Sequence, residues 1–220
     1  MLARTEVDSN CGCTCTQVFE YFTFTPDGRA LSLSQRTPGG PRVDYDYIWL
    51  DDLPIAQVAE SYLSNGSHLS TAITYLHPDH LGTPRLGTAA TGLIVWKMQS
   101  DGFGKPHITS PLEGNNITVD VRLRLPGQIA YGVGGINYNY YRDYDPNVGR
   151  YLESDPIGLD GGLNTYGYVD QNPLTFSDAD GLTKGGKKNI STEGFNRHSN
   201  PAAVERALRD AIKNRQLQRA

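Results

Sequence analysis

The sequence predicts a mainly β protein, made of short strands joined by tight turns and followed by a short C-terminal α-helix. The 220 residues include 24 Gly, 13 Pro and 13 Tyr but only 2 Met, and this composition favours strands and turns over helical bundles. Residues 138–182 place Asp-Pro, Gly-Gly, Asn-Pro and Asp-Gly pairs between short Tyr-rich runs. Such turn signals predict a close series of hairpins. The length suits one domain of ordinary size and a tail.

The predicted strands follow one another from the N-terminal region. Residues 18–33 contain two apolar runs on either side of Pro26-Asp27-Gly28, which is a turn sequence. Residues 44–63 have the pattern of two strands that are joined at residues 51–54. Later segments complete the set: a strand at residues 94–97 with a turn at 101–104, and a strand at 119–125 in which apolar and charged residues alternate.

Charge divides the chain near Leu182. The whole chain has a formal net charge of −4, which indicates neither a nucleic-acid-binding protein nor an acidic disordered chain. From Thr183 onward, nine Lys and Arg residues stand against three Asp and Glu, so this tail carries +6 and the remainder −10. The sequence therefore predicts a boundary at this point.

The tail is expected to contain one basic amphipathic helix, over residues 201 to about 217. Asn200 is a good N-cap, and Pro201 suits the first helical position. The apolar residues recur at helical spacing, and basic residues occupy the other faces: Val204, Leu208, Ala211 and Ile212 against Arg206, Arg209, Lys213 and Arg215. The basic face is either simply solvated or a contact for nucleic acid or an acidic partner.

Two groups of potential metal ligands have simpler interpretations. Cys11, Cys13 and Cys15 stand in the sequence CGCTC without a nearby His, whereas a zinc site needs four ligands. His77-Pro78-Asp79-His80 offers imidazole and carboxylate groups, but the surrounding Pro and Gly residues indicate a turn whose side chains bond to the backbone. No metal or other cofactor is predicted.

The order of the turn elements resembles the end of the RHS (rearrangement hotspot) repeat-associated core, the family that includes the YD-repeat shells of insecticidal toxin complexes. Residues 47–56 and 77–84 also resemble elements that precede this signature, and so many fixed spacings make the match specific. The matching elements are Tyr144-Asp145-Pro146, Gly149-Arg150-Tyr151, Ser154-Asp155-Pro156-Ile157-Gly158, Gly161-Gly162-Leu163-Asn164, Tyr166, Asn172-Pro173 and Gly181-Leu182.

The resemblance implies a division of the chain and a fold for its parts. Residues 1–43 would be a variable N-terminal segment with a β-hairpin, residues 44–182 the core, and residues 183–220 a variable basic tail, a truncated toxin tip. In the family, repeated hairpins build a β-spiral shell in which each hairpin is buried against its neighbours. This chain would hold the end of such a shell.

The resemblance also implies self-cleavage after Leu182, at the bond to Thr183, which would release the tail as encapsulated cargo. The family's catalytic aspartates correspond to Asp155 and Asp178. Two carboxyl groups held close do not both ionise, so one can act as an acid while the other activates water. Arg150 or Arg142 would bias which of them ionises.

One departure from the family pattern opens an alternative. The family has Asp-Pro-x-Gly-Leu, whereas this chain has Asp178-Ala179-Asp180-Gly181-Leu182. Without Pro the turn is looser, and Asp180 adds a charge beside the pair. The chain would then be a non-cleaving structural remnant. A third alternative places toxin activity in the tail, but its 38 residues contain a single His and no paired acid and base.

Partners and location follow from the resemblance alone. Related proteins serve competition between bacteria, with a secretion system that delivers them and an immunity protein that protects the producer. No apolar run approaches the about 20 residues that a membrane-spanning helix needs, and the N-terminus lacks the pattern of a signal peptide. Export is therefore expected to use another route, with the chain cytoplasmic before it.

Overall fold

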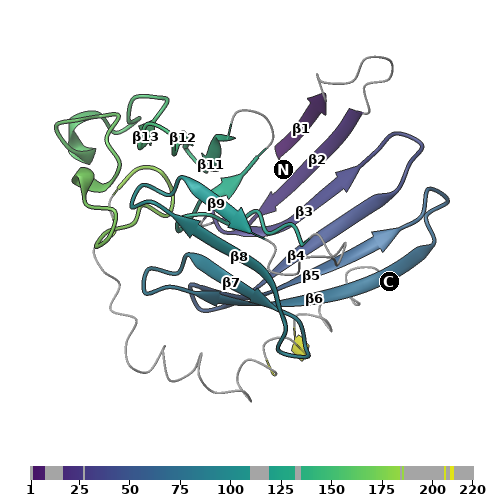
Figure 1. Cartoon of the computed structure of the whole chain (residues 1–220). Coiled ribbons are helices and arrows are strands. Elements are labelled where there is room, and N and C mark those ends of the chain that lie inside the picture. The colour runs from purple at the N-terminus through teal and green to yellow at the C-terminus, as the bar shows by residue number, and fades with distance from the viewer. Residues whose placement is uncertain are drawn as a thin grey trace.

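Nine antiparallel strands form one large sheet. The computed structural model describes residues 2–7, 17–26, 28–109, 119–131, 135–183, 185, 206, 209 and 210. Each strand pairs with the next one along the chain, and Figure 1 shows them side by side in this order. The strands are β1 (Leu2–Val7), β2 (Gln17–Phe24), β3 (Ala30–Arg36), β4 (Arg42–Leu50), β5 (Leu53–Tyr62), β6 (His68–Pro78), β7 (Pro84–Thr88), β8 (Ile94–Ser100) and β9 (Pro106–Thr109).

A recurring turn, in which a Gly N–H donates to the carbonyl three residues earlier, joins many of these strands. Between β6 and β7, the Gly82 N–H donates to the Asp79 carbonyl at 3.0 Å, and Gly82 has a φ of +98°, which suits a residue without Cβ. The Asp79 carboxylate accepts the N–H groups of Leu81 and Thr83 and pairs with Arg85 at 2.9 Å. Asp79 of the His77–His80 element therefore bonds to the backbone of its own turn, as predicted.

One face of the sheet carries the main core. Phe22, Leu33 and Trp96 are almost fully buried there, and the segment at residues 119–131 packs over them. The sequence predicted a strand at residues 119–125, but only Leu123 forms a β-bridge, to Ile129. The alternation in this segment reflects burial instead: Val121, Leu123 and Leu125 are buried, and the segment lies on the sheet rather than within it.

Buried polar contacts fix this covering segment to the sheet. Glu20 is fully buried on β2 and accepts hydrogen bonds from Gln35 at 2.8 Å and Arg122 at 3.1 Å. Gln57 on β5 donates to the Asp120 carbonyl at 3.0 Å. Because buried polar groups need partners, these contacts determine where the segment and the turn that follows it lie.

A smaller four-stranded sheet follows, in the order β10 (Ile129–Ala130), β11 (Asn137–Asn139), β12 (Arg142–Asp145) and β13 (Arg150–Tyr151). Two short 3₁₀ helices, η2 (Gly158–Gly161) and η3 (Val169–Gln171), come after it. Tyr144, Tyr151 and Tyr168 form the core of this smaller lobe. Residues 138–182 therefore form strands and turns, as predicted, with two 3₁₀ turns added.

The smaller lobe rests on the turns at one end of the large sheet (Figure 1). The Tyr144 hydroxyl donates to the Phe103 carbonyl, in the β8–β9 turn, at 2.7 Å. His80, in the β6–β7 turn, bonds to the Leu174 carbonyl at 3.0 Å. The strand turns therefore form the platform on which the later segments, and the site they carry, are placed.

Two predicted strand pairs are present, and the structure describes three residues of the predicted tail helix. The hairpin at residues 18–33 and the strand pair at 44–63 are confirmed by β2–β3 and β4–β5. The boundary expected between residues 43 and 44 falls inside β4. Of the predicted tail helix, the structure describes Arg206, Arg209 and Asp210, which have helical backbone. The three cysteines lie outside the described residues. No helix within the described ranges is long and apolar enough to cross a membrane.

Candidate functional site

Asp155 begins a tight Asp-Pro turn. Its Oδ1 accepts the Ile157 N–H at 3.0 Å, and its carbonyl accepts the Gly158 N–H at 3.0 Å. Its own N–H donates to the Thr165 carbonyl at 2.8 Å. Asp followed by Pro is a favoured start for such a turn. The turn fixes the backbone, so the second carboxylate oxygen, Oδ2, is held toward the interior.

Asp178 begins the second turn. Its Oδ1 accepts the N–H groups of Gly181 at 2.9 Å and Leu182 at 3.1 Å, and Gly181 has a φ of +79°. Ser177 and Gly185 are joined by an antiparallel bridge, with the Gly185 N–H 2.7 Å from the Ser177 carbonyl. The Leu182–Thr183 bond therefore lies in a short loop that is closed at both ends.

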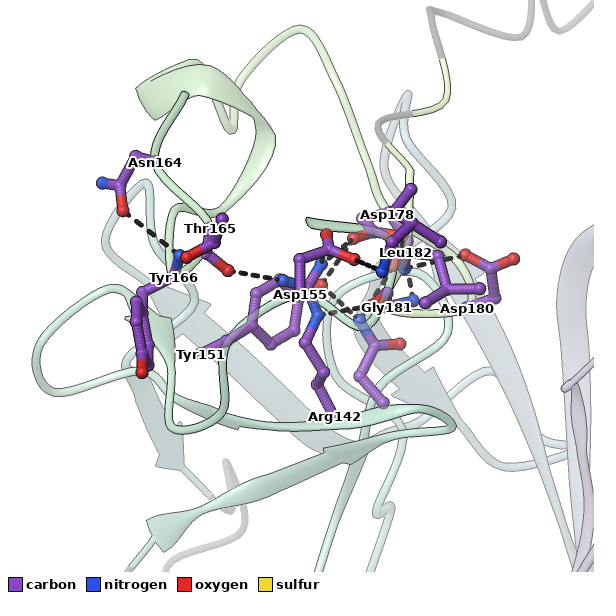
Figure 2. Close-up of polar contacts among 12 residues, drawn as sticks. Arg142, Tyr151, Asp155, Asn164, Thr165, Tyr166, Asp178, Asp180, Gly181 and Leu182 are labelled. Atoms are coloured by element: carbon purple, nitrogen blue, oxygen red, sulfur yellow. Dashed lines mark hydrogen bonds and ion pairs between the residues drawn. The ribbon is translucent and has the colours of Figure 1, made fainter. Parts of the chain in front are cut away.

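Arg142 lies between the two carboxylates. One amino group of its guanidinium is 2.9 Å from Asp155 Oδ2 and 3.3 Å from Asp178 Oδ2. Nε donates to the Gly181 carbonyl and the other amino group to the Thr165 carbonyl at 3.1 Å. All three residues are buried: Arg142 is 4% exposed, Asp155 7% and Asp178 3%. Figure 2 shows this cluster, in which the Arg142 guanidinium contacts both carboxylates.

Strand alternation decides which of the two predicted arginines reaches the carboxylates. Arg142 is paired with Asn139 across β11 and β12, and Tyr144 with Tyr151 across β12 and β13. Paired residues share a face of the sheet, so these four side chains point the same way and are buried. Arg150 is paired with Asp145 on the opposite face and is exposed. It lies outside the cluster.

Two further residues contact Asp178 and were not predicted. The Tyr151 hydroxyl donates to Asp178 Oδ2 at 2.8 Å, and its ring lies 3.6 Å from the Arg142 guanidinium. Asn139 Nδ2 donates to the Tyr151 hydroxyl at 2.8 Å and to the Asp178 carbonyl at 3.0 Å. Asn139 stands in the Tyr-rich run, and Tyr151 is the last residue of the Gly-Arg-Tyr element. Period-two alternation together with the register of β11, β12 and β13 places them on the same face as Arg142.

Burial raises the pKa of Asp178 from 3.8 to about 6. The hydrogen bond from Tyr151 and the charge of Arg142 oppose this shift, whereas the neighbouring Asp180 carboxylate adds to it. A buried carboxyl group whose pKa lies near neutrality can hold a proton and give it up under ordinary conditions. Asp178 therefore has the property that a general acid requires.

A cavity of about 50 Å³ opens beside the carboxylates. Its lining includes Asp155, Asp178, Gly161 and Leu182. A Cβ on Gly161 would lie 2.5 Å from Asp155 Oδ2 and 3.2 Å from the Leu182 carbonyl oxygen, so both atoms lie beside Gly161 and a side chain there would displace them. About 10–15 Å³ is enough for a water molecule. The cavity can therefore place water beside both a carboxylate and the Leu182 carbonyl.

The Leu182–Thr183 bond stands at the edge of this cluster. Leu182 is half-buried, and Thr183 is exposed. Within the described ranges, no group of three or more His, Cys, Asp or Glu is arranged to hold a metal ion. The charge between the two carboxylates is supplied by Arg142. The arrangement is suited to acid–base chemistry on a backbone carbonyl.

Comparisons with known proteins identify relatives among bacterial toxins. No protein-family model matches the chain. It is 33% identical over 145 residues to double-stranded DNA deaminase toxin A of Burkholderia cenocepacia, covering 64% of this chain and 10% of that protein. It is 45% identical over 103 residues to probable deoxyribonuclease RhsA of Dickeya dadantii, covering 47% and 7%. The chain thus spans a small part of the length of either protein.

The fold has counterparts among solved structures. A chain of the Photorhabdus luminescens Tc holotoxin pore, which contains TccC3, superimposes with a TM-score of 0.58 at 21% identity, covering 83% of this chain and 10% of that one. This likeness concerns the fold, while the sequence matches extend to proteins of the Rhs type. The chain is an RHS-associated protein, related to bacterial toxins of the Rhs type.

Proposed function

We propose that residues 44–182 are the terminal part of an RHS core and that this core cuts its own chain between Leu182 and Thr183. One observation carries the proposal. Two buried carboxyl groups from separate turns share the Arg142 guanidinium, at 2.9 and 3.3 Å, directly beside the loop that contains this bond. Two carboxyl groups that are held by one cation but have different surroundings are suited to dividing the acid and base roles.

The two aspartates have different surroundings, which suggest their roles. Asp155 lines the cavity, and its Oδ2 and the Leu182 carbonyl oxygen both lie beside Gly161, so Asp155 is assigned as the base that accepts a proton from water. The water oxygen then attacks the Leu182 carbonyl carbon. Asp178 contacts the N–H of Leu182, next to the leaving nitrogen of Thr183, and is assigned as the acid. When the C–N bond breaks, its proton passes to that nitrogen and leaves a Leu182 carboxyl group and a free Thr183 amine.

The proposal is tested by following the purified chain, with a tag at each end, by intact-mass spectrometry over several days. Two fragments whose masses add up to the parent plus one water, and which end and begin at Leu182 and Thr183, are expected. Incubation at pH 5, 6, 7 and 8 should show faster cleavage on the acidic side of pH 6, where Asp178 holds its proton. A folded chain that stays whole at every pH would refute self-cleavage.

The loop is held in place without the proline of the family pattern. The Asp178, Asp180 and Gly181 carbonyls accept hydrogen bonds from Asn139, Tyr141 and Arg142. Ala179 packs closely against Gly127, in the turn within the covering segment. These contacts replace part of the restriction that a proline would give.

Ala179→Pro is expected to accelerate cleavage about 2- to 5-fold. A proline restricts the open conformations of the loop, an effect of about 0.4–1 kcal/mol when the site accepts it, and each 1.4 kcal/mol changes a rate about tenfold. Initial rates of fragment formation provide the measurement. Ala179→Val, which keeps the backbone N–H, is the control and should not accelerate the reaction. An equal rate for the proline variant would show that the loop is already fully ordered, and a slower rate would show that its backbone does not accept proline.

A second candidate function is a structural segment of the shell that cleaves nothing. It is favoured by the extent to which Asp178 is already engaged, because both of its oxygens accept hydrogen bonds. A fully engaged carboxylate gives up these bonds when it takes a proton. The intact-mass experiment separates the two candidates, since the segment would fold but remain whole.

The wider role is proposed from the relatives. The sheet would close a β-spiral shell around the tail, which would be the cargo. We propose that the producing bacterium exports the protein, with a secretion-system component and an immunity protein as partners. The +6 charge of the tail suits it to contact with a nucleic acid. Any toxin activity would then lie in this tail.

A further inference from the structure

The Tyr151 hydroxyl has an orientation fixed by its neighbours. Asn139 Nδ2 donates to its oxygen at 2.8 Å, and the hydroxyl donates to Asp178 Oδ2, also at 2.8 Å. Because the amide group of Asn139 supplies a hydrogen to the phenol oxygen, the phenol hydrogen is available for the carboxylate. Tyr151 is 1% exposed, so water does not compete for this bond. The hydrogen bonds therefore run in one direction, from Asn139 through the Tyr151 hydroxyl to Asp178.

The donors that face Asp178 differ in what they can do when the carboxyl group takes a proton. Oδ1 faces the N–H groups of Gly181 and Leu182, and Oδ2 faces Arg142 and Tyr151. Backbone N–H and guanidinium groups cannot accept a hydrogen bond, whereas a hydroxyl group can both donate and accept. On the Oδ2 side, Tyr151 is thus the group that can serve Asp178 in either protonation state.

We infer that Tyr151 is a positioning residue for self-cleavage, which holds Asp178 through the Asn139–Tyr151–Asp178 chain and thereby sets the pH range in which Asp178 keeps its proton. The inference rests on the proposed function. Its physical basis is that a hydrogen bond to a charged acceptor is about twice as strong as one between neutral groups. Tyr151 therefore stabilises the carboxylate form of Asp178 more than the protonated form.

Other charged and titratable groups also face Asp178, and they stay in place when only the Tyr151 hydroxyl is removed. Arg142 from β12 favours the carboxylate, and Asp180 in the same loop opposes it. Asp155 approaches the same Arg142 amino group. Burial raises the pKa of Tyr168, and the charges of Tyr144 and Asp178 add to this shift. Tyr151→Phe keeps the ring that stacks on Arg142 and removes only the oxygen. The variant therefore removes the hydrogen bond to the Asp178 carboxylate and the one that Asn139 donates to the hydroxyl, while Asn139 keeps its bond to the Asp178 carbonyl.

The test measures the titration of Asp178 directly. The chain is labelled with ¹³C-carboxyl aspartate, in an Asp155→Asn background that is not expected to cleave, and the Asp178 signal is assigned by its absence when Asp178→Asn is added. Adding Tyr151→Phe should move the midpoint of this signal upward by about one pH unit, the difference between a charge-assisted and a neutral hydrogen bond. In the chain that retains Asp155 and cleaves, the pH at which the cleavage rate falls to half should rise by a similar amount.

Tyr144→Phe is the matched control. Tyr144 belongs to the same aromatic cluster as Tyr151, with ring centroids 5.6 Å apart, but its hydroxyl donates to Phe103 instead of Asp178. This variant should leave both midpoints unchanged. An Asp178 midpoint that Tyr151→Phe does not raise would overturn the inference even if cleavage slows. If the parent does not cleave, the proposed function fails, while the titration still decides the role of Tyr151.

Discussion

Replacing either Asp155 or Asp178 by Asn is expected to slow cleavage at Leu182–Thr183 at least about 100-fold, the usual contribution of a general acid or base. Asn has nearly the size of Asp but cannot exchange a proton in this way. The loss should be similar for the two variants, because each removes one partner of a shared step. Intact-mass spectrometry over several days measures the remaining rate in each variant and in the parent.

A matched control separates chemistry from folding. Asp160→Asn removes an exposed carboxylate from the 3₁₀ turn η2 of the same lobe, and it should leave the cleavage rate unchanged. Circular dichroism and thermal unfolding of all three variants check that the fold persists. Asp155→Asn is the more decisive of the two, since Asp178 also accepts two backbone N–H groups of the loop. Cleavage at the parental rate in a folded Asp155→Asn chain would refute the assignment.

Arg142→Met is expected to lower the free energy of unfolding by about 3–5 kcal/mol, as found when one partner of a buried ion pair is removed. The change leaves two buried carboxyl groups without their cation, and it also removes donors to the Gly181 and Thr165 carbonyls. For a chain of this size the midpoint of thermal unfolding should fall by about 6–20 °C. Urea titration of the uncleaved chain gives the free energy.

The matched control is Arg85→Met. Arg85 also pairs with an Asp at 2.9 Å, but its side chain is 33% exposed, and such pairs contribute at most about 1 kcal/mol. Adding Asp155→Asn and Asp178→Asn to Arg142→Met should recover part of the stability, because the unpaired charges are then gone. Equal losses for Arg142→Met and Arg85→Met would show that the two carboxyl groups do not depend on Arg142.

Local sequence signals were sufficient for the hairpins. The Asp-Gly pair at residues 27–28 and the run at 44–63 predicted two strand pairs correctly, since a turn signal between apolar runs acts over a few residues. The segment at residues 119–125 shows the limit of the same reasoning. Its alternation is real, but alternation records which side chains are buried, and it does not record whether a neighbouring strand is available. Here the polar contacts of Glu20 and Gln57 place the segment on top of the sheet.

For the candidate site, the sequence supplied two turns and a resemblance that singled out Asp155 and Asp178. It did not distinguish Arg142 from Arg150, because both stand in Tyr-rich strands close to the turns. The register of β11, β12 and β13 made that choice, by turning Arg142, Asn139 and Tyr151 to the buried face and Arg150 to the solvent. Turns are encoded within four or five residues. The meeting of Asp155, Asp178 and Arg142 depends on long-range packing, since the smaller lobe must first be held on the turns of the large sheet.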